Sequence, residues 1–359
     1  MMPDKNLYIP FEFYSYIGGP TTFMRNLKEY LDAHNYNYAN KLSNADGIFF
    51  PISFDRPALN KIKKSGGRII QRLDGIWYPE KHGPEYKELN RYVRDIYINY
   101  ADHVVFQSEY SRRQCFAMLG EIPEDRYSLI YNGVDQSRFF PDESPHNSDL
   151  FRIVTTGNFR NKDMIEPVIH ALDSLAGDYK FEFDVIGPIR NNNLASLLKR
   201  DYTICHGPLG RPQIADKLRH ADIFVYSHLN PPCPNSVLEA ISSGLPVVGY
   251  DSGSMSELCH FSKELLAYVS DDIFQSYDDF DAGKLAEKFR LCIDNYEEYK
   301  TTAMRHSRDY SFEKCGKAYL DVFNDVMSKP PVNKGEMTRP SLTEISKYAI
   351  KKFLIKVRK

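Results

Sequence analysis

The sequence has 359 residues, which is too long for one ordinary hydrophobic core and suits two domains of about 150 to 200 residues each. Its composition is globular, with 42% hydrophobic and 26% charged residues, and a formal net charge of -2 excludes a surface that binds polyanions throughout. Six cysteines lie far apart without a CxxC pair, so the sequence encodes neither a zinc site nor a disulfide framework and fits a reducing compartment.

Short apolar segments alternate with longer amphipathic segments along most of the chain, a pattern typical of parallel strands joined by helices. In the first part of the chain the expected strands are 7–13, 47–52, 67–73, 103–108 and 127–133. Further along they are 151–157, 181–187, 202–207, 222–227 and 245–250. Apolar spacing, with Gly or Pro at the ends, predicts helices between them at 19–34, 109–119, 164–175, 211–221 and 236–243.

The pattern lapses into Pro, Ser, Asp and Asn from Phe139 to Leu150 and then restarts with a strong strand, so we place the domain linker there. The two α/β units predict two Rossmann-like lobes, residues 1–145 and 146–311, with parallel sheets that face each other across a cleft. In such sheets ligands sit beyond the carboxyl ends of the strands. No GxGxxG, GxxxxGK[ST] or HExxH motif occurs, which weighs against dinucleotide, P-loop and zinc-protease sites.

Two glycines, Gly18 and Gly19, separate the first strand-like segment from a helix expected to begin near Thr21 or Thr22. Such a junction presents free backbone N–H groups to an anion at a helix amino terminus. A simple tight turn is the alternative interpretation.

The second lobe begins with the same arrangement of strand, glycine, polar loop and helix. Here Gly157 and Asn158 are followed by Arg160 and Lys162 within the loop. Two cations at the mouth of a parallel sheet neutralise a diphosphate, Arg through its planar fork and Lys as a point charge. The alternative is a solvated loop.

The segment "NPPCPNSVLEAISSGLPVVG", Asn230 to Gly249, combines a proline cluster with a short helix and a strand. Ser236 and Glu239 have the S-x-x-E spacing of a capping box, in which the glutamate only closes the first helical turn. In the alternative, the N–H groups of residues 235–237 hold a phosphate and Glu239 accepts hydrogen bonds from sugar hydroxyls. Prolines 231, 232 and 234 stiffen the loop that positions them.

This segment, taken as "HADIFVYSHLNPPCPNSVLEAISSGLPVVGYDSGSMSEL", resembles glycosyltransferase family 4, as do "YADHVVFQSEYSRRQ", "IYNGVDQSRFFP" and "GGPTTFMRNL". The family comprises retaining, nucleotide-sugar-dependent enzymes of GT-B fold, and the resemblance runs from about residue 7 to 325. It implies that Glu239 contacts the ribose and that the loop before it, including Pro234, Asn235, Ser236 and Val237, lies against the diphosphate and donor sugar. It also implies that Arg160 and Lys162 bind the diphosphate and that Gly19 approaches it from the first lobe. Residues 312–328 resemble the family's last helix, which packs back on the first lobe.

One position departs from the family pattern. The family usually has an acidic residue eight positions before the ribose glutamate, where it meets hydroxyls of the donor sugar, and here that position is Pro231. We expect His228, Asn230, Cys233 or backbone N–H groups of the proline loop to take over, unless the donor is held differently.

The segment "QRLDGIWYP", Gln71 to Pro79, follows a first-lobe strand where the family often has a His-Asp pair near the reacting centre. Only Asp74 remains here, and we expect it to orient the acceptor or to stabilise positive charge on the anomeric carbon. A turn-forming Asp-Gly is the alternative. Trp77 and His82 are candidates for the acceptor pocket, although a lone histidine is more often structural.

The tail, residues 329–359, changes character from Arg339 onward, where seven basic residues against one glutamate give a net charge of about +6. Its apolar residues fall on one face at helical spacing, which suits an anionic membrane surface, while a solvated or lobe-crossing helix is the alternative. No leader with a basic start and an apolar run opens the sequence, and no run of about 18 apolar residues occurs. We therefore expect a cytoplasmic protein, peripheral at the inner face of the membrane if the tail binds lipid.

The expected reaction is sugar transfer from a nucleoside diphosphate to a glycan or lipid-linked acceptor, as in the synthesis of bacterial surface polysaccharides. Helix amino termini with Arg160 and Lys162 stabilise the leaving diphosphate, so no metal or other cofactor is expected. A nucleotide-sugar 2-epimerase of the same fold is an alternative, but it needs further acid/base residues in the cleft. A binding protein that has lost catalysis, suggested by Pro231, is another.

Overall fold

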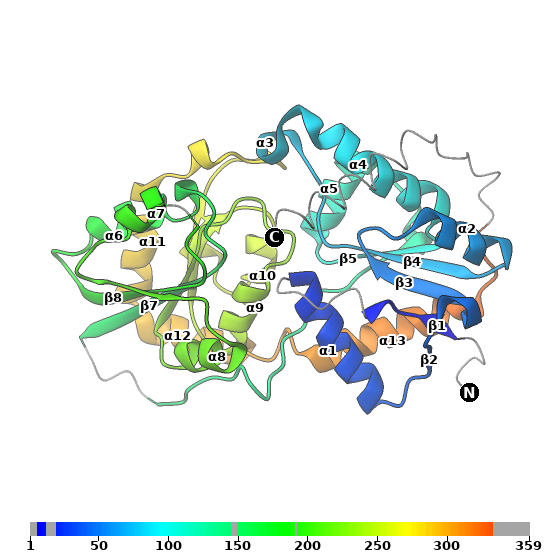
Figure 1. The fold of residues 1–359 in the computed structure, drawn as a ribbon. Coiled ribbons are helices and arrows are strands. Elements are labelled where there is room, and N and C mark those ends of the chain that lie inside the picture. Colours follow the sequence, from blue (N-terminus) through cyan, green and yellow to red (C-terminus); the bar gives the residue numbers. More distant parts are fainter. Residues whose placement is uncertain (1–5, 12–18, 145–148, 191, 333–359) are drawn as a thin grey trace.

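The structure is a computed structural model that describes residues 6–11, 19–144, 149–190 and 192–332, and it consists of two lobes side by side (Figure 1). Each lobe is built on a six-stranded sheet with helices against it, and the strand pairs are parallel. The expected α/β fold with two Rossmann-like lobes is thereby confirmed. Gly18 and the basic tail from Arg339 lie outside the described residues.

The first lobe has strands in the order β2-β1-β3-β4-β5-β6. Its strands are β1 Leu7–Tyr8, β2 Tyr38–Ala39, β3 Gly47–Pro51, β4 Arg68–Leu73, β5 His103–Phe106 and β6 Tyr127–Leu129. Its α-helices are α1 Gly19–Ala33, α2 Arg56–Lys64, α3 Pro79–His82, α4 Tyr86–Asp95 and α5 Glu109–Leu119. Three short 3₁₀ helices, η2 Leu42–Asn44, η3 Gly83–Glu85 and η5 Glu124–Arg126, and one π-helix, η4 Ile96–Tyr100, complete the lobe. Strands β3, β4 and β5 are buried along their whole length, as expected of a sheet covered on both faces.

The second lobe has strands in the order β12-β11-β10-β7-β8-β9, the arrangement of a doubly wound nucleotide-binding sheet. Its strands are β7 Leu150–Thr156, β8 Lys180–Ile186, β9 Thr203–Gly207, β10 Ile223–Tyr226, β11 Val247–Asp251 and β12 Leu266–Tyr268. Its helices are α6 Glu166–Asp173, α7 Asn192–Leu197, α8 Arg211–Arg219, α9 Asn235–Ser242, α10 Met255–Leu258, α11 Ala282–Asp294 and α12 Tyr296–His306, with η6 Lys162–Met164, η7 Lys263–Leu265 and η8 Tyr277–Asp279.

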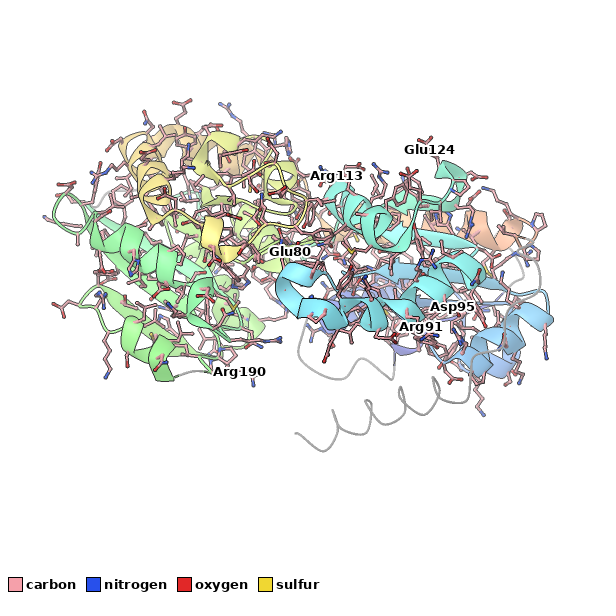
Figure 2. The ribbon with its side chains drawn as sticks, turned by 90° about the horizontal axis from the view of Figure 1, so that it is seen from above. Glu80, Arg91, Asp95, Arg113, Glu124 and Arg190 are labelled. Atoms are coloured by element: carbon pink, nitrogen blue, oxygen red, sulfur yellow. The ribbon has the colours of Figure 1, made fainter. Side chains whose placement is uncertain are left out.

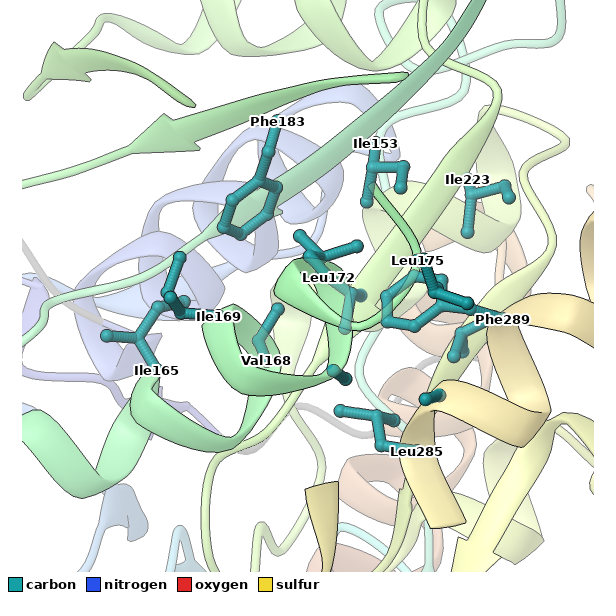
Figure 3. Packing of buried hydrophobic residues seen from close by; sticks show 14 of the residues in the cluster. Ile153, Ile165, Val168, Ile169, Leu172, Leu175, Phe183, Ile223, Leu285 and Phe289 are labelled. Carbon is teal, nitrogen blue, oxygen red and sulfur yellow. The ribbon is translucent and has the colours of Figure 1, made fainter. Parts of the chain in front are cut away.

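Helix α6 shows how the second lobe is packed. Its apolar residues recur at the i, i+3, i+4 and i+7 spacing of one helix face, and they are fully buried: Ile165, Val168, Ile169 and Leu172. This face packs between the sheet and α11, where Figure 3 shows these side chains among residues of β7, β8, β10 and α11. The core therefore fixes the start of α6, and with it the loop that follows β7.

The chain crosses between the lobes twice. After the second lobe it returns as helix α13, Phe312–Ser328, which packs against α1 and the first sheet through Tyr319 and Phe323. At the crossing the two segments lie together, because Val134 N donates to Tyr310 O and Phe312 N donates to Val134 O, both at 2.8 Å. Within the described residues, no helix combines the length and the apolar character needed to span a bilayer.

Candidate active site

The loops that leave β7 and β10 meet at the point where the strand order of the second sheet reverses. Gly157 follows β7 and His228 follows β10, and a Cβ atom on Gly157 would lie 2.8 Å from Cε1 of His228. A larger residue at position 157 would therefore require the His228 ring to shift. A crevice of this kind, beyond the carboxyl ends of parallel strands, is the usual ligand site of doubly wound sheets.

Arg160 and Lys162 both lie exposed in the loop after β7. Lys162 Nζ donates to both carboxylate oxygens of Glu166, at 3.1 and 2.8 Å, and this hydrogen bond raises the pKa of Lys162. Burial, followed by the charge of Arg160, lowers the pKa of Lys81 on α3 of the first lobe. Lys81, which the sequence analysis missed, is therefore a cation close to Arg160 from the opposite lobe.

A further arginine, Arg190, lies in the loop after β8. Its Nε donates to Asn158 Oδ1 at 3.0 Å, and its backbone N–H donates to Phe159 O at 3.1 Å, which ties the two loops together. Figure 2 shows Arg190 on the second lobe and Glu80, on α3, at the junction of the two lobes. Nothing in the spacing of the sequence singled out Arg190.

Helix α9 begins at Asn235, one residue earlier than expected, and Pro234 occupies the cap position without a side-chain hydrogen bond. The capping-box interpretation is therefore wrong. Glu239 is instead buried, at 7% exposure, and its Oε1 accepts a hydrogen bond from Arg211 Nη1 at 2.8 Å. Burial raises the pKa of Glu239, and Arg211 acts in the opposite direction. Arg211 opens α8 and had no signal in the sequence, because its partner lies 28 positions away.

The proline loop before α9 is fixed within the second lobe. Asn230 has a φ of 50°, and its side-chain amide exchanges two hydrogen bonds with the backbone of Gln275, at 2.9 and 3.2 Å. A Cβ on Gly253, at a φ of 63°, would lie 2.5 Å from the backbone of Pro231. Asn230 thus anchors the loop, while Cys233 is a buried thiol whose pKa burial raises to about 12.

His228 is a neutral ring at the mouth of the second sheet. Burial lowers its pKa to about 4, and its Nε2 is buried without a hydrogen-bond partner among the described residues. The ring centroid lies 4.7 Å from that of Tyr226, which holds its orientation. A buried side-chain nitrogen without a hydrogen-bond partner is rare in folded proteins, which makes His228 a candidate for a ligand contact.

Asp74 follows β4 in the first lobe, and its side chain is 5% exposed. Its Oδ1 accepts hydrogen bonds from Arg72 Nη1 and from Gln107 Nε2, the latter at 3.1 Å. Its Oδ2 is buried without a partner among the described residues. Gly75, the next residue, approaches Pro232 of the second lobe, since a Cβ there would lie 3.8 Å from Pro232 Cγ.

Two residues of the first lobe form hydrogen bonds with the proline loop and the start of α9. Asn132 Nδ2 lies 3.0 Å from Cys233 O and 2.8 Å from Asn235 Oδ1, and Ser108 Oγ donates to Pro232 O. These contacts hold the start of α9 at the junction of the two lobes, where Gly75, the residue after Asp74, also approaches Pro232. The residues are far apart in sequence, so no local pattern pointed to them.

Trp77 lies two residues before the short helix α3, and His82 is the last residue of that helix. Both backbone groups of Trp77 are bonded to the side chain of Asn90, at 3.1 and 2.6 Å. His82 Nδ1 lies 3.2 Å from Tyr78 N and O, and burial lowers the pKa of the ring. Tyr78 stacks on Phe274 of the second lobe at 4.8 Å, so α3 is docked across the junction. Gly19 is the first residue of α1.

Residues 151–278 match the family model described as "Glycosyl transferases group 1". Among solved structures, Anabaena HepE in complex with UDP and glucose has a TM-score of 0.66 at 14% identity over 90% of this chain and 100% of that chain. WaaG, described as a glycosyltransferase involved in lipopolysaccharide biosynthesis, has a TM-score of 0.61 at 12% identity over 88% and 97% of the two chains. S. aureus TarM, in complex with Fondaparinux, alpha-GlcNAc-glycerol and UDP, has a TM-score of 0.59 at 13% identity over 86% and 59%.

No curated protein sequence matches the chain. The likeness to solved structures extends over both lobes, and at such low identity it concerns the fold. The family match, in contrast, covers β7 to η8 and so includes the proposed donor loops, α9 and Glu239. Residues 151–278 thus match a group 1 glycosyl transferase domain, and the chain as a whole has the two-lobed GT-B fold of the solved glycosyltransferase structures.

Proposed function

We propose that this chain is a retaining, family 4 glycosyltransferase that moves a sugar from a nucleoside-diphosphate sugar to a glycan or lipid-linked acceptor. One observation carries the proposal. The start of α9, with Glu239 buried one turn further on, lies against the first-lobe residues around Asp74, so that a donor held at α9 has its sugar directed at the junction of the lobes. UDP and glucose are bound in the HepE structure, and Fondaparinux, alpha-GlcNAc-glycerol and UDP are bound in the TarM structure, both of which share this fold.

Each end of the donor has candidate partners in the second lobe. Glu239 uses one oxygen for Arg211, which leaves its other oxygen for ribose hydroxyls. The first N–H groups of α9, from Asn235 and Ser236, have no intrahelical partners and bind the diphosphate together with Arg160 and Lys162. Gly157 permits close approach of the backbone, and Lys81 adds a cation from the first lobe.

The chemistry then requires stabilisation of charge at two places. Negative charge grows on the leaving diphosphate, where the helix amino terminus and the cations act without a metal. Positive charge grows on the sugar in an oxocarbenium-like transition state, and we assign its stabilisation to Asp74, whose Oδ2 has no hydrogen-bond partner among the described residues. The unsatisfied Nε2 of His228 takes the sugar contact that a carboxylate at position 231 would otherwise make.

The acceptor side and the cellular role are inferred more broadly. Trp77, just before the docked helix α3, and His82, at its end, are assigned to the acceptor entrance. Synthesis of a bacterial surface polysaccharide suits a basic tail that holds the enzyme at the inner leaflet of the membrane, and WaaG of the same fold acts in lipopolysaccharide biosynthesis. Co-sedimentation with anionic liposomes should be lost when residues 339–359 are deleted, and retention of binding by the deleted chain would refute the membrane role.

A panel of UDP-, GDP- and ADP-sugars tests the donor assignment, because a ligand that binds only the folded state raises the melting temperature. The sugar that stabilises most is then offered with candidate acceptors, and the anomeric configuration of the product is read by NMR. Retention of configuration supports the proposal, and inversion contradicts it. Transfer by the wild type but none by Glu239→Ala excludes a catalytically inactive binding protein, and a 2-epimerised donor without transfer would favour the epimerase.

A further inference from the structure

The side-chain amide nitrogen of Asn132, three residues after the end of β6, lies within hydrogen-bond distance of more acceptor atoms than it has N–H groups. Its side chain is 6% exposed, and Nδ2 lies 3.0 Å from Gln107 Oε1, 3.0 Å from Cys233 O and 2.8 Å from Asn235 Oδ1. A primary amide has two N–H groups. One of the three acceptors belongs to the first lobe and two belong to the second.

Because three acceptors surround two N–H groups, the Asn132 amide can form its hydrogen bonds in two different arrangements of the lobes. With the lobes together its N–H groups reach Cys233 and Asn235, and with the lobes apart one N–H turns to Gln107 within its own lobe. Opening therefore leaves one N–H of Asn132 paired with Gln107 and turns the other toward the solvent that enters the junction, so the residue favours neither a permanently open nor a permanently closed molecule. Such a two-state contact is what a reversible closing motion requires.

Arg72 fixes the other side of the same amide. It is 1% exposed, and its Nη2 donates to Asn132 Oδ1 at 2.6 Å while its Nη1 donates to Asp74. The guanidinium is held from behind by Tyr319 OH at 2.9 Å and by the ring of Phe23, whose centroid lies 3.7 Å from Cζ. One buried cation thus orients both the carboxylate of Asp74 and the amide that reaches into the second lobe.

We infer that Asn132 is a positioning residue that couples closure of the lobes to the placement of the start of α9 opposite Asp74. The role of Asn132 in catalysis rests on the proposed function, because closure of the lobes would bring a sugar donor bound at α9 to Asp74. The coupling itself is a property of the protein without substrate. The two claims are therefore tested by separate measurements.

The substitution Asn132→Asp isolates the contact. A carboxylate of the same shape still accepts from Arg72 but has no N–H for Cys233 O or Asn235 Oδ1. Asn44→Asp is the matched control, an exposed residue of η2 at the opposite end of the first sheet. In hydrogen exchange without substrate, peptides covering residues 232–238 should lose protection at least tenfold in Asn132→Asp, and small-angle scattering should give a larger radius of gyration. Unchanged exchange and radius in a folded Asn132→Asp protein would overturn the inference.

The kinetic arm separates positioning from a merely structural role. UDP as a probe should bind Asn132→Asp within threefold of the wild-type Kd, whereas kcat with UDP-glucose should fall at least tenfold. An equal loss in Kd and kcat, or no loss in kcat, would also overturn the inference. If the wild type neither binds UDP nor turns over UDP-glucose while the exchange and scattering differences hold, the donor assignment fails and the coupling stands.

Discussion

Glu257 in the second lobe and Tyr131 in the first are joined by a hydrogen bond of 2.6 Å, donated by the tyrosine hydroxyl. The same carboxylate accepts from the first backbone N–H groups of α5, those of Glu109 at 2.6 Å and Tyr110 at 3.1 Å. A carboxylate at a helix amino terminus completes orphan donors and complements the helix dipole. Glu257 of the second lobe therefore caps the amino terminus of α5 in the first lobe, and this contact exists only when the lobes are together.

Substitution of Glu257 should favour the open arrangement. Hydrogen bonds to a charged group contribute about 1.5 to 3 kcal/mol, so Glu257→Gln should shift closure by roughly tenfold or more. We expect a larger radius of gyration by small-angle scattering and a matching fall in kcat/KM. Glu264→Gln, an exposed residue of η7, serves as the control. A closed, fully active Glu257→Gln protein would show that this contact is incidental.

Arg160 and Lys162 should differ in their importance. Both face the diphosphate in the proposed site, but Lys162 is exposed and bonded to Glu166, while Arg160 lies near Lys81. We expect Arg160→Ala to lower turnover about a hundredfold and Lys162→Ala about tenfold, since charge stabilisation of a leaving group is a large term in catalysis. The assay contains EDTA, and Lys180→Ala at the far end of β8 is the control. Unchanged turnover in both variants would remove them from the site.

Glu239→Gln should weaken nucleotide binding without unfolding the protein. The amide keeps the shape of the side chain but loses the charge that pairs with Arg211 and accepts ribose hydroxyls. Two lost or weakened hydrogen bonds correspond to about a tenfold to hundredfold rise in the Kd for UDP. Isothermal titration measures this, with Glu124→Gln on the outer surface as the control. An unchanged Kd would place the ribose elsewhere.

Stability should fall in mild acid because two histidines are held neutral. Burial lowers the pKa of His103 and of His228 to about 4 each, whereas an unfolded histidine titrates near 6.5. The unfolded chain binds more protons between these values, so this stabilisation is complete above pH 6.5 and is lost as the pH falls toward 4. Each histidine should cost about 2 kcal/mol between pH 7 and pH 5. Urea unfolding at the two pH values measures the fall in the free energy of unfolding. His103→Gln should halve this fall, and His170→Gln, at an exposed position, should leave it unchanged.

The sequence was sufficient for the architecture but only partly for the site. Strands β3 to β11 follow short apolar runs, and the position of a site after β7 and before α9 follows from where parallel strands end. Strand β2 has two residues and β12 three, too few to give a periodic signal. The capping box failed because Pro234 caps α9 and a distant arginine takes the glutamate.

The contacts that join the lobes could not be predicted for a different reason. Glu257 meets α5 across 148 positions, and Asn132 meets Asn235 across 103. Such pairs depend on how two separate folding units are oriented, which neither local propensity nor spacing encodes. The buried Arg72 was missed because its strand, RIIQRL, also contains Arg68 and Gln71, so its polar character alone did not mark it out.

The paired crossing at Val134 and Tyr310 limits how the molecule can open. Because the two connecting segments are bonded to each other, shear or twisting of one half against the other would break both bonds, while bending about the shared line preserves them. We therefore expect the two lobes to open and close by bending about one axis. The lobes would then return to the same relative orientation after each turnover, and the residues at their junction would keep their relative positions.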